Sequence, residues 1–312
     1  MTGAWVNLAA TRPEPPTLQR YTQARVPMPL HPLLHRWLVH TAQQKLRERM
    51  AGEQRPADVP PETCDIAIMF ALGIEAGGLV DRMDERIALR GRGFTIRLGS
   101  LASRRVAIVT SGAGAKNAAL ATEAVLDAHR PQWIVSAGLA GGLKSDLRRN
   151  DVVMANCVAD AKGRQLQIDL MVEPSELEKH PGVHVGRLLS ADRPIRHPEE
   201  KARLGEEHDA MAVDMETFAV AEACRLRHVR CLSVRIVYDP LDERLPRDVE
   251  TLLAQPTMAT RLGAAAAAVF RRPSSVKDLY RLRENALVAS ERLATFLEGV
   301  VGELDVRPAD AS

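Results

Sequence analysis

The amino-acid sequence predicts an α/β fold, built as one domain with extensions. From residue 65 onward, short apolar runs of strand length alternate with segments of helical periodicity, as in a sheet covered by helices. A chain of 312 residues, 46% of them hydrophobic, can bury the large core that such a domain needs. We place the domain at residues 63–304, after an N-terminal extension at 1–62 and before a frayed tail at 305–312.

The composition argues against several classes of function. The net charge of +2 and the 4% aromatic content offer neither the electrostatic field nor the stacking surfaces typical of a nucleic-acid binding protein. The four cysteines lack C-x-x-C spacing, so we expect buried free thiols in a reducing compartment and no metal site. No apolar run reaches membrane-spanning length and no signal peptide is evident, which favours a cytoplasmic protein.

The N-terminal extension is rich in proline, and its first half therefore lacks a regular element. Residues 35–50 follow the periodicity of an amphipathic helix. That helix has three possible docking surfaces: the body of the protein, a partner subunit or a membrane. We favour docking on the protein itself, because the polar face of the helix mixes acidic, basic and amide side chains.

Small or ionisable residues follow several predicted strands of the body. The first strand begins at Asp65 and opens into Gly73-Ile74-Glu75, where the glutamate is either a helix cap or a site residue. A later strand runs into the loop Ser111-Gly112-Ala113-Gly114, and another, at 132–137, into the glycine-rich segment 138–143. Such loops let backbone N–H groups approach a polar ligand, although neither matches a dinucleotide or ATP motif, so no cofactor is predicted.

Residues 210–239 read as strand, helix and strand, with ionisable groups where buried strands end. Asp214 and Glu216 lie at the first junction, Arg235 lies inside the second strand, and Asp239 ends it. One interpretation is structural: Asp214 caps the helix and Arg235 pairs with a carboxylate. The other is a ligand site, because open α/β sheets bind ligands at the carboxyl edge of their strands.

The C-terminal region predicts two helices, at 245–270 and 276–301, separated by Arg271-Arg272-Pro273. Leucines form an apolar stripe on the second helix, and we expect that stripe to pack on the core. They are Leu279, Leu282, Leu287, Leu293 and Leu297.

Several segments together resemble the superfamily of purine nucleoside phosphorylases and methylthioadenosine/S-adenosylhomocysteine nucleosidases. They are the glutamate after the first strand, SGAGAKNAA, SAGLAGGL before a DVV strand, VDMETFAVAEA and VRIVYD, and they cover about Asp65 to Asp239. The resemblance implies a three-layer α/β/α domain around a twisted mixed sheet. It also implies a homo-oligomeric enzyme that cleaves the N-glycosidic bond of a small-molecule nucleoside.

The resemblance assigns roles to the acidic residues. Asp239 corresponds to the acid that protonates N7 of the departing purine, and Glu75 to the base that orients an attacking water. Glu216 and the backbone around Met215 correspond to the ribose site. Such a reaction passes through an oxocarbenium-like state, so a proton donor for the base and a carboxylate near the sugar both suit it.

Further residues are implied as substrate-binding. Ser111 and Gly112 correspond to the side from which water or phosphate arrives, and Arg235 to an arginine near the sugar. The bacterial hexameric phosphorylases have arginines in their phosphate loops that this chain lacks, which favours water over phosphate as the nucleophile.

Two departures from the nucleosidases leave the substrate open. Tyr238 stands where a serine usually contacts adenine, and Leu139 stands where the glycine loop usually carries serine. These changes bring the chain closer to the hopanoid-associated phosphorylase branch, whose proposed substrate is adenosylhopane. The main prediction is therefore a purine nucleosidase acting on a 5′-substituted adenosine. The alternatives are that phosphorylase and a non-catalytic nucleoside-binding module.

Overall fold

The computed structural model describes residues 63–91, 93–168, 170, 180–245 and 274–306. The predicted N-terminal extension, its amphipathic helix and the predicted helix at 245–270 lie outside the described residues. The described elements follow one another in this order: β1 (Ile66–Phe70), α2 (Gly73–Val80), β2 (Asp84–Arg90), β3 (Thr95–Leu101), β4 (Arg104–Thr110), α3 (Ala115–His129), β5 (Trp133–Gly142), β6 (Val152–Asp160), β7 (Gln165–Gln167), β8 (Val183–Ser190), α5 (Pro198–Glu207), β9 (Ala212–Asp214), α6 (Thr217–Leu226), β10 (Arg230–Asp239) and α9 (Ser274–Glu303).

All ten strands join one mixed sheet, which confirms the predicted α/β class. One half is open, with β2, β3, β4 and β1 leading to β5. In the other half, β5 pairs with β10, β10 with β6, β6 with β8, β8 with β9, and β9 returns to β5. The sheet therefore closes on itself at one end, a feature that the sequence patterns did not predict.

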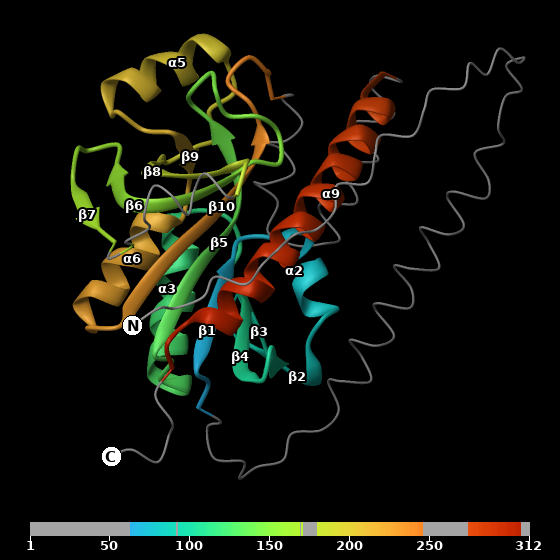
Figure 1. The fold of residues 1–312 in the computed structure, drawn as a ribbon, viewed down its shortest axis with the longest axis vertical. Coiled ribbons are helices and arrows are strands. Elements are labelled where there is room, and N and C mark those ends of the chain that lie inside the picture. The colour runs from blue at the N-terminus through green and yellow to red at the C-terminus, as the bar shows by residue number, and fades with distance from the viewer. Residues whose placement is uncertain (1–62, 92, 169, 171–179, 246–273, 307–312) are drawn as a thin grey trace, which may run out of the picture. The chain divides into compact units, whose positions relative to one another are not determined.

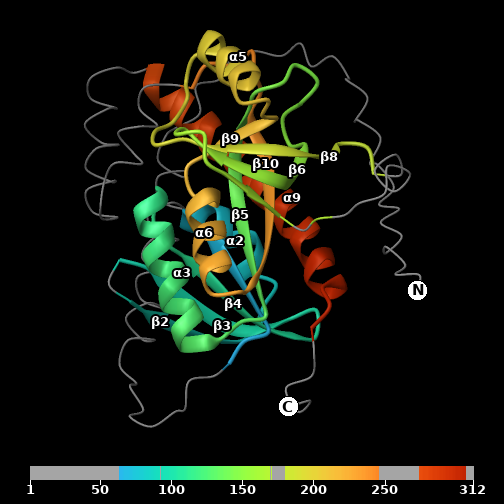
Figure 2. The ribbon, with the colours of Figure 1, turned by 90° about the vertical axis from the view of Figure 1, so that its left-hand side faces the viewer.

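Helices cover both faces of the open half, as Figures 1 and 2 show: α2 and α9 on one face, α3 and α6 on the other. The central position of strand β1, with helices on both faces, explains why its sequence is continuously apolar. Ile66, Ile68 and Phe70 pack with α2 and α9, while Ala67 and Met69 pack with α3 and α6. Alternate side chains of a strand point to opposite faces, so a central strand needs apolar residues at every position.

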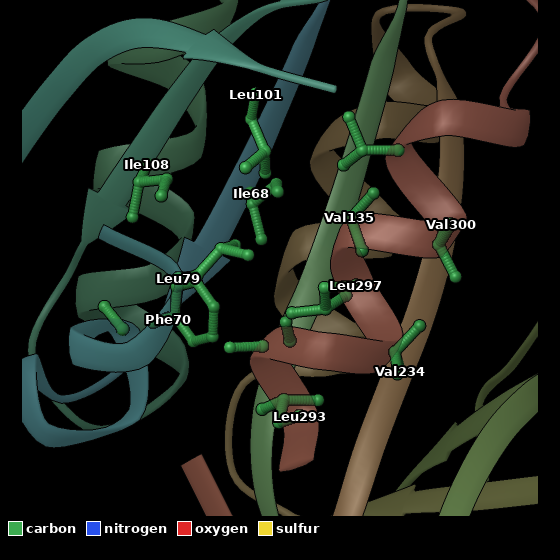
Figure 3. Close-up of a cluster of buried hydrophobic side chains, with 14 of the residues drawn as sticks. Ile68, Phe70, Leu79, Leu101, Ile108, Val135, Val234, Leu293, Leu297 and Val300 are labelled. Atoms are coloured by element: carbon green, nitrogen blue, oxygen red, sulfur yellow. The ribbon is translucent and has the colours of Figure 1, made fainter. Parts of the chain in front are cut away.

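Helix α9 supplies much of the core on its face of the sheet (Figure 3). Leu293 and Leu297 are fully buried against the sheet and α2, which confirms packing on the body for this part of the predicted stripe. The side chain of Leu279 lies outside the described part. Leu287 was wrongly placed on that stripe, because it is 50% exposed. The buried positions in this part of α9 are Ala286, Ala289 and Ser290, so the apolar face turns away from Leu287.

Asp305, the first residue of the predicted tail, contacts the body of the protein. The carbonyl oxygen of Asp305 accepts hydrogen bonds from the indole of Trp133 and from Arg230. Residues 307–312 lie outside the described part. Within the part that is described, no helix combines the length and apolar character needed to span a bilayer.

Candidate active site

A cavity of about 160 Å³ opens where β1, β5, β9 and β10 end. Glu75, Glu216 and Asp239, three acids far apart in the sequence, all line it. All three are buried or half-buried, although carboxyl groups are usually exposed. The other lining residues are Ala71, Leu72, Ala113, Leu139, Ala140, Gly141, Arg193, Pro194, Ile195, Val213, Asp214, Met215, Tyr238 and Leu245.

Glu75 lies in the first turn of α2 and is held from two directions. Its Oε2 accepts the backbone N–H of Leu72 at 2.7 Å, and its Oε1 accepts that of Leu139 at 3.0 Å. The hydroxyl of Ser290 on α9 donates to the main-chain oxygen of Glu75 at 3.0 Å. Burial raises the pKa of this carboxyl, although both backbone hydrogen bonds oppose the shift. Glu75 thus both caps its helix and lines the cavity, so the two positions that the sequence suggested for it are compatible.

Gly138 on β5 lets Glu75 and Arg235 approach the same backbone. A Cβ atom at this position would lie 2.9 Å from Oε1 of Glu75 and 3.3 Å from Nη1 of Arg235. Real Cβ atoms essentially never come that close to a neighbouring atom, so glycine is required for the observed position of the Glu75 carboxyl.

Arg235 is buried and paired with Asp214. Its Nε and Nη2 lie 2.9 and 2.7 Å from Oδ2 of Asp214, and Nη2 also donates to the hydroxyls of Ser136 and Thr217. The Asp214 carboxylate accepts the backbone N–H of Thr217 at 2.9 Å as well, at the start of α6. These contacts agree with the structural interpretation from the sequence, in which Asp214 caps helix α6 and Arg235 pairs with a carboxylate. Asp214 lines the cavity, and Arg235 does not.

Glu216 begins helix α6 and reaches the loop before α3. Its Oε1 accepts the backbone N–H of Gly114 at 2.6 Å. Gly112 and Gly114 have φ angles of 85° and 94°, in the region that favours glycine, and this turns the loop toward the carboxylate. Burial, with a further contribution from the nearby Asp214 charge, raises the pKa of Glu216 to about 7. Its neighbour Met215 lines the cavity too.

Asp239 ends β10 next to a buried lysine. The side chain of Asp239 is 6% exposed and that of Lys201, on α5, is fully buried, with Nζ 2.6 Å from Oδ2. Burial raises the pKa of Asp239 to about 7, although the Lys201 charge acts in the opposite direction. Sequence analysis missed Lys201, because nothing distinguishes it from the other charged residues of the polar segment Pro198–Glu207.

Of the remaining predicted site residues, one lines the cavity and two do not. Tyr238 lines the cavity, and its hydroxyl donates to the carbonyl of Leu282 on α9 at 2.8 Å. Ser111 and Gly112 do not line it. The Ser111 hydroxyl instead donates to the carbonyls of Phe70 and Gly112, and it is the next residue, Ala113, that reaches the cavity.

A sequence model described as the phosphorylase superfamily matches residues 65–272, about two thirds of the chain. The chain belongs to the phosphorylase superfamily. This match confirms the family that the sequence motifs indicated.

Two curated relatives are methylthioadenosine/S-adenosylhomocysteine nucleosidases. The protein of Staphylococcus haemolyticus is 27% identical over 211 residues, which cover 61% of this chain and 92% of the relative. That of Maridesulfovibrio salexigens is 28% identical over 200 residues, 57% of this chain and 87% of the relative. Among solved structures, the Neisseria meningitidis nucleosidase in complex with methylthio-immucillin-A has a TM-score of 0.60. It is 21% identical and covers 77% of this chain and 99% of its own, so it shows a shared fold.

The four cysteines of this phosphorylase-superfamily chain do not line the cavity. Cys64, Cys157 and Cys224 are buried, Cys231 is half-buried and all four are free thiols, so three of the four match the predicted buried thiol. Within the described ranges, no group of three or more histidine, cysteine, aspartate or glutamate residues could hold a metal ion.

Proposed function

We propose that this protein cleaves the N-glycosidic bond of a purine nucleoside and releases the free base, with water as the nucleophile. The observation that carries the proposal is the meeting of Glu75, Glu216 and Asp239 in one cavity at the carboxyl ends of the strands. The names of the two curated relatives agree with this reaction.

The three acids have complementary tasks in this reaction. As the C1′–N9 bond breaks, its electron pair enters the purine, and N7 takes the proton of Asp239. The oxygen of a water molecule bonds to C1′ and gives one proton to Glu75. The Glu216 carboxylate accepts hydrogen bonds from the ribose hydroxyls, and its charge stabilises the cationic sugar. A pKa of about 7 suits Asp239 to the acid role, because the carboxyl then keeps its proton near neutral pH.

The surroundings of the cavity favour water over phosphate. A phosphate dianion needs cationic partners, and two arginines are near enough to be considered. Arg235 is paired with Asp214 at 2.7 Å, and Arg193, which lines the cavity, is paired with Glu200 at 2.5 Å. Each guanidinium already has a carboxylate partner. Ser111 and Gly112 remain candidates for the nucleophile side through the backbone of their loop.

The substrate that we propose is an adenosine with a 5′ substituent. Apolar side chains contribute to the lining of the cavity, among them Leu139, Ile195 and Leu245, and they suit an apolar group such as a thioether. The relatives are named after methylthioadenosine and S-adenosylhomocysteine, both of which have a thioether sulfur at the 5′ position. A homo-oligomer in the cytoplasm stays a prediction of the sequence.

Adenine release tests the proposal. The purified full-length protein is incubated with methylthioadenosine or adenosine, with and without phosphate, and free adenine is measured. We expect adenine without phosphate, and faster release from methylthioadenosine. Strict dependence on phosphate would show that phosphate is the nucleophile instead of water, and would indicate a phosphorylase. No release from any purine nucleoside would contradict the enzymatic proposal and favour a binding module.

A further inference from the structure

Lys201 occupies an unusual position for a lysine, because its side chain is fully buried. Besides Oδ2 of Asp239 at 2.6 Å, three main-chain carbonyl oxygens surround Nζ. These belong to Asp239 at 3.2 Å, Pro240 at 2.8 Å and Glu243 at 2.9 Å. An ammonium has three N–H donors, so the carbonyl oxygens can engage all of them.

The contact with Asp239 is therefore mainly one between charges. Although Oδ2 lies at contact distance from Nζ, it has no hydrogen-bond partner among the described residues. The three carbonyls keep the lysine in place whether or not Asp239 has lost its proton. Carbonyl oxygens only accept hydrogen bonds, so they match the N–H donors of the lysine.

Burying an ammonium costs on the order of several kcal/mol unless a partner compensates its charge. The compensation here comes from the three carbonyl oxygens and from Asp239, which ends β10 and lines the cavity. Helix α5 thus brings an ammonium group next to the Asp239 carboxyl in the interior of the protein.

We propose that Lys201 is a positioning residue that orients the Asp239 carboxyl and stabilises its carboxylate form once the proton has left. This inference rests on the proposed function, in which Asp239 gives its proton to the purine. The proton moves from the Asp239 carboxyl to N7, and Lys201 keeps all three of its own. A buried aspartic acid without this charge would hold its proton more tightly, because desolvation disfavours the carboxylate.

Other charges also face Asp239, and they act in both directions. Arg149, in the loop before β6, lowers the pKa of Asp239, and Glu243, in the loop after β10, raises it. These two residues form an ion pair with each other, and the ring of Tyr238 lies under the Arg149 guanidinium. Around the cavity lie Glu75, Asp214, Glu216 and Arg193. Of the described carboxylates, Asp239 is the one in ion-pair contact with Lys201.

The test is the pH dependence of kcat/KM for adenine release by full-length variants. In the wild type, activity should fall as pH rises through about 7, where Asp239 loses its proton. Lys201→Gln removes the charge but keeps N–H donors for the carbonyls. We expect its alkaline limb to move upward by about one to three pH units, because loss of an opposite charge raises an acid's pKa. Lys201→Arg keeps the charge and should leave the limb near its wild-type position.

Two further variants complete the test. Glu243→Gln should move the alkaline limb downward, because it removes a charge that raises the pKa of Asp239. Lys144→Gln changes a partly exposed lysine that pairs with Asp209, and should leave the profile unchanged. Should Lys201→Gln not fold, as judged by thermal unfolding, Lys201→Met provides the second neutral side chain of similar length.

The outcomes separate this inference from the proposed function. Loss of kcat in the folded neutral variant without movement of the limb would assign Lys201 a purely structural role and overturn the inference. If Glu243→Gln also leaves the alkaline limb in place, Asp239 does not determine the pH of that limb. This outcome would overturn the inference too. Absence of adenine release by the wild type would instead contradict the proposed function.

Discussion

Asp239 is the residue whose protonation changes with the departure of the purine in the proposed reaction. Asp239→Asn keeps the shape of the side chain and removes its acidic proton. We expect kcat for adenine release to fall by about two to four orders of magnitude, with a much smaller change in KM. The exposed neighbour Asp242 provides the control, and Asp242→Asn should retain wild-type kinetics. Retained turnover in Asp239→Asn would assign the acid role elsewhere.

Gly138 offers a test of the Glu75 position that leaves the glutamate itself unchanged. Gly138→Ala places a methyl group 2.9 Å from Oε1 of Glu75, whose carboxylate two backbone N–H groups hold in place. We expect the carboxylate to be displaced and kcat to fall at least about tenfold. Gly77→Ala on α2 meets no atom within 4 Å and should keep its activity. Equal activity of both variants would contradict a role for Glu75 in orienting water.

The three acids could be predicted from the sequence because each follows a recognisable strand. A polar residue after an apolar run is visible in one dimension, and the parallel strands β1, β5 and β10 bring Glu75 and Asp239 to one edge. Glu216 joins them from the end of β9, which runs antiparallel to β5. Lys201 could not be predicted in this way. It lies in a polar helix segment and meets Asp239 across 38 positions of the chain, so only the fold reveals that it is buried.

Helix α9 links the core to the site, since its Leu297 packs in the core and its Ser290 holds the backbone of Glu75. Leu297→Ala should lower the free energy of unfolding by about 2–5 kcal/mol, the usual cost of a large cavity in a core. Leu287→Ala, on the exposed side of the same helix, should change it by less than about 0.5 kcal/mol. Urea unfolding of both variants measures the difference. Equal losses would mean that α9 packs through another face.

At the level of elements, periodicity predicted the strands and helices that are apolar on at least one face. Strand β2 was not predicted, because its sequence DERIALR is mostly charged and its side chains are largely exposed at the edge of the sheet. The closed half of the sheet was not predicted either. Its pairings β5–β10 and β9–β5 join residues far apart in the sequence, and a strand pattern does not specify its partners.

For the whole molecule, buried acids make stability depend on pH. Glu216 has a pKa of about 7 in the folded protein, above the roughly 4.3 of a free glutamate. Between these values the folded state binds more protons than the unfolded state, so this group makes the free energy of unfolding fall as pH rises from about 4 to 7.

Glu216→Gln removes that dependence. We expect the variant to exceed the wild type in stability at pH 8 by roughly 1–3 kcal/mol more than at pH 4.5, while losing activity. Urea unfolding at the two pH values measures the change, and the exposed Glu206→Gln serves as the control. A stability difference that is independent of pH would show that folding does not raise the pKa of Glu216.

The most direct test of the account is a crystal structure with a C-nucleoside analogue of adenosine, whose C–C linkage cannot be cleaved. We predict that Asp239 lies within hydrogen-bond distance of N7, that Glu216 contacts the ribose hydroxyls, and that Glu75 binds a water molecule facing C1′. The account would be contradicted if the analogue bound in a position where these three carboxyl groups do not all lie around it.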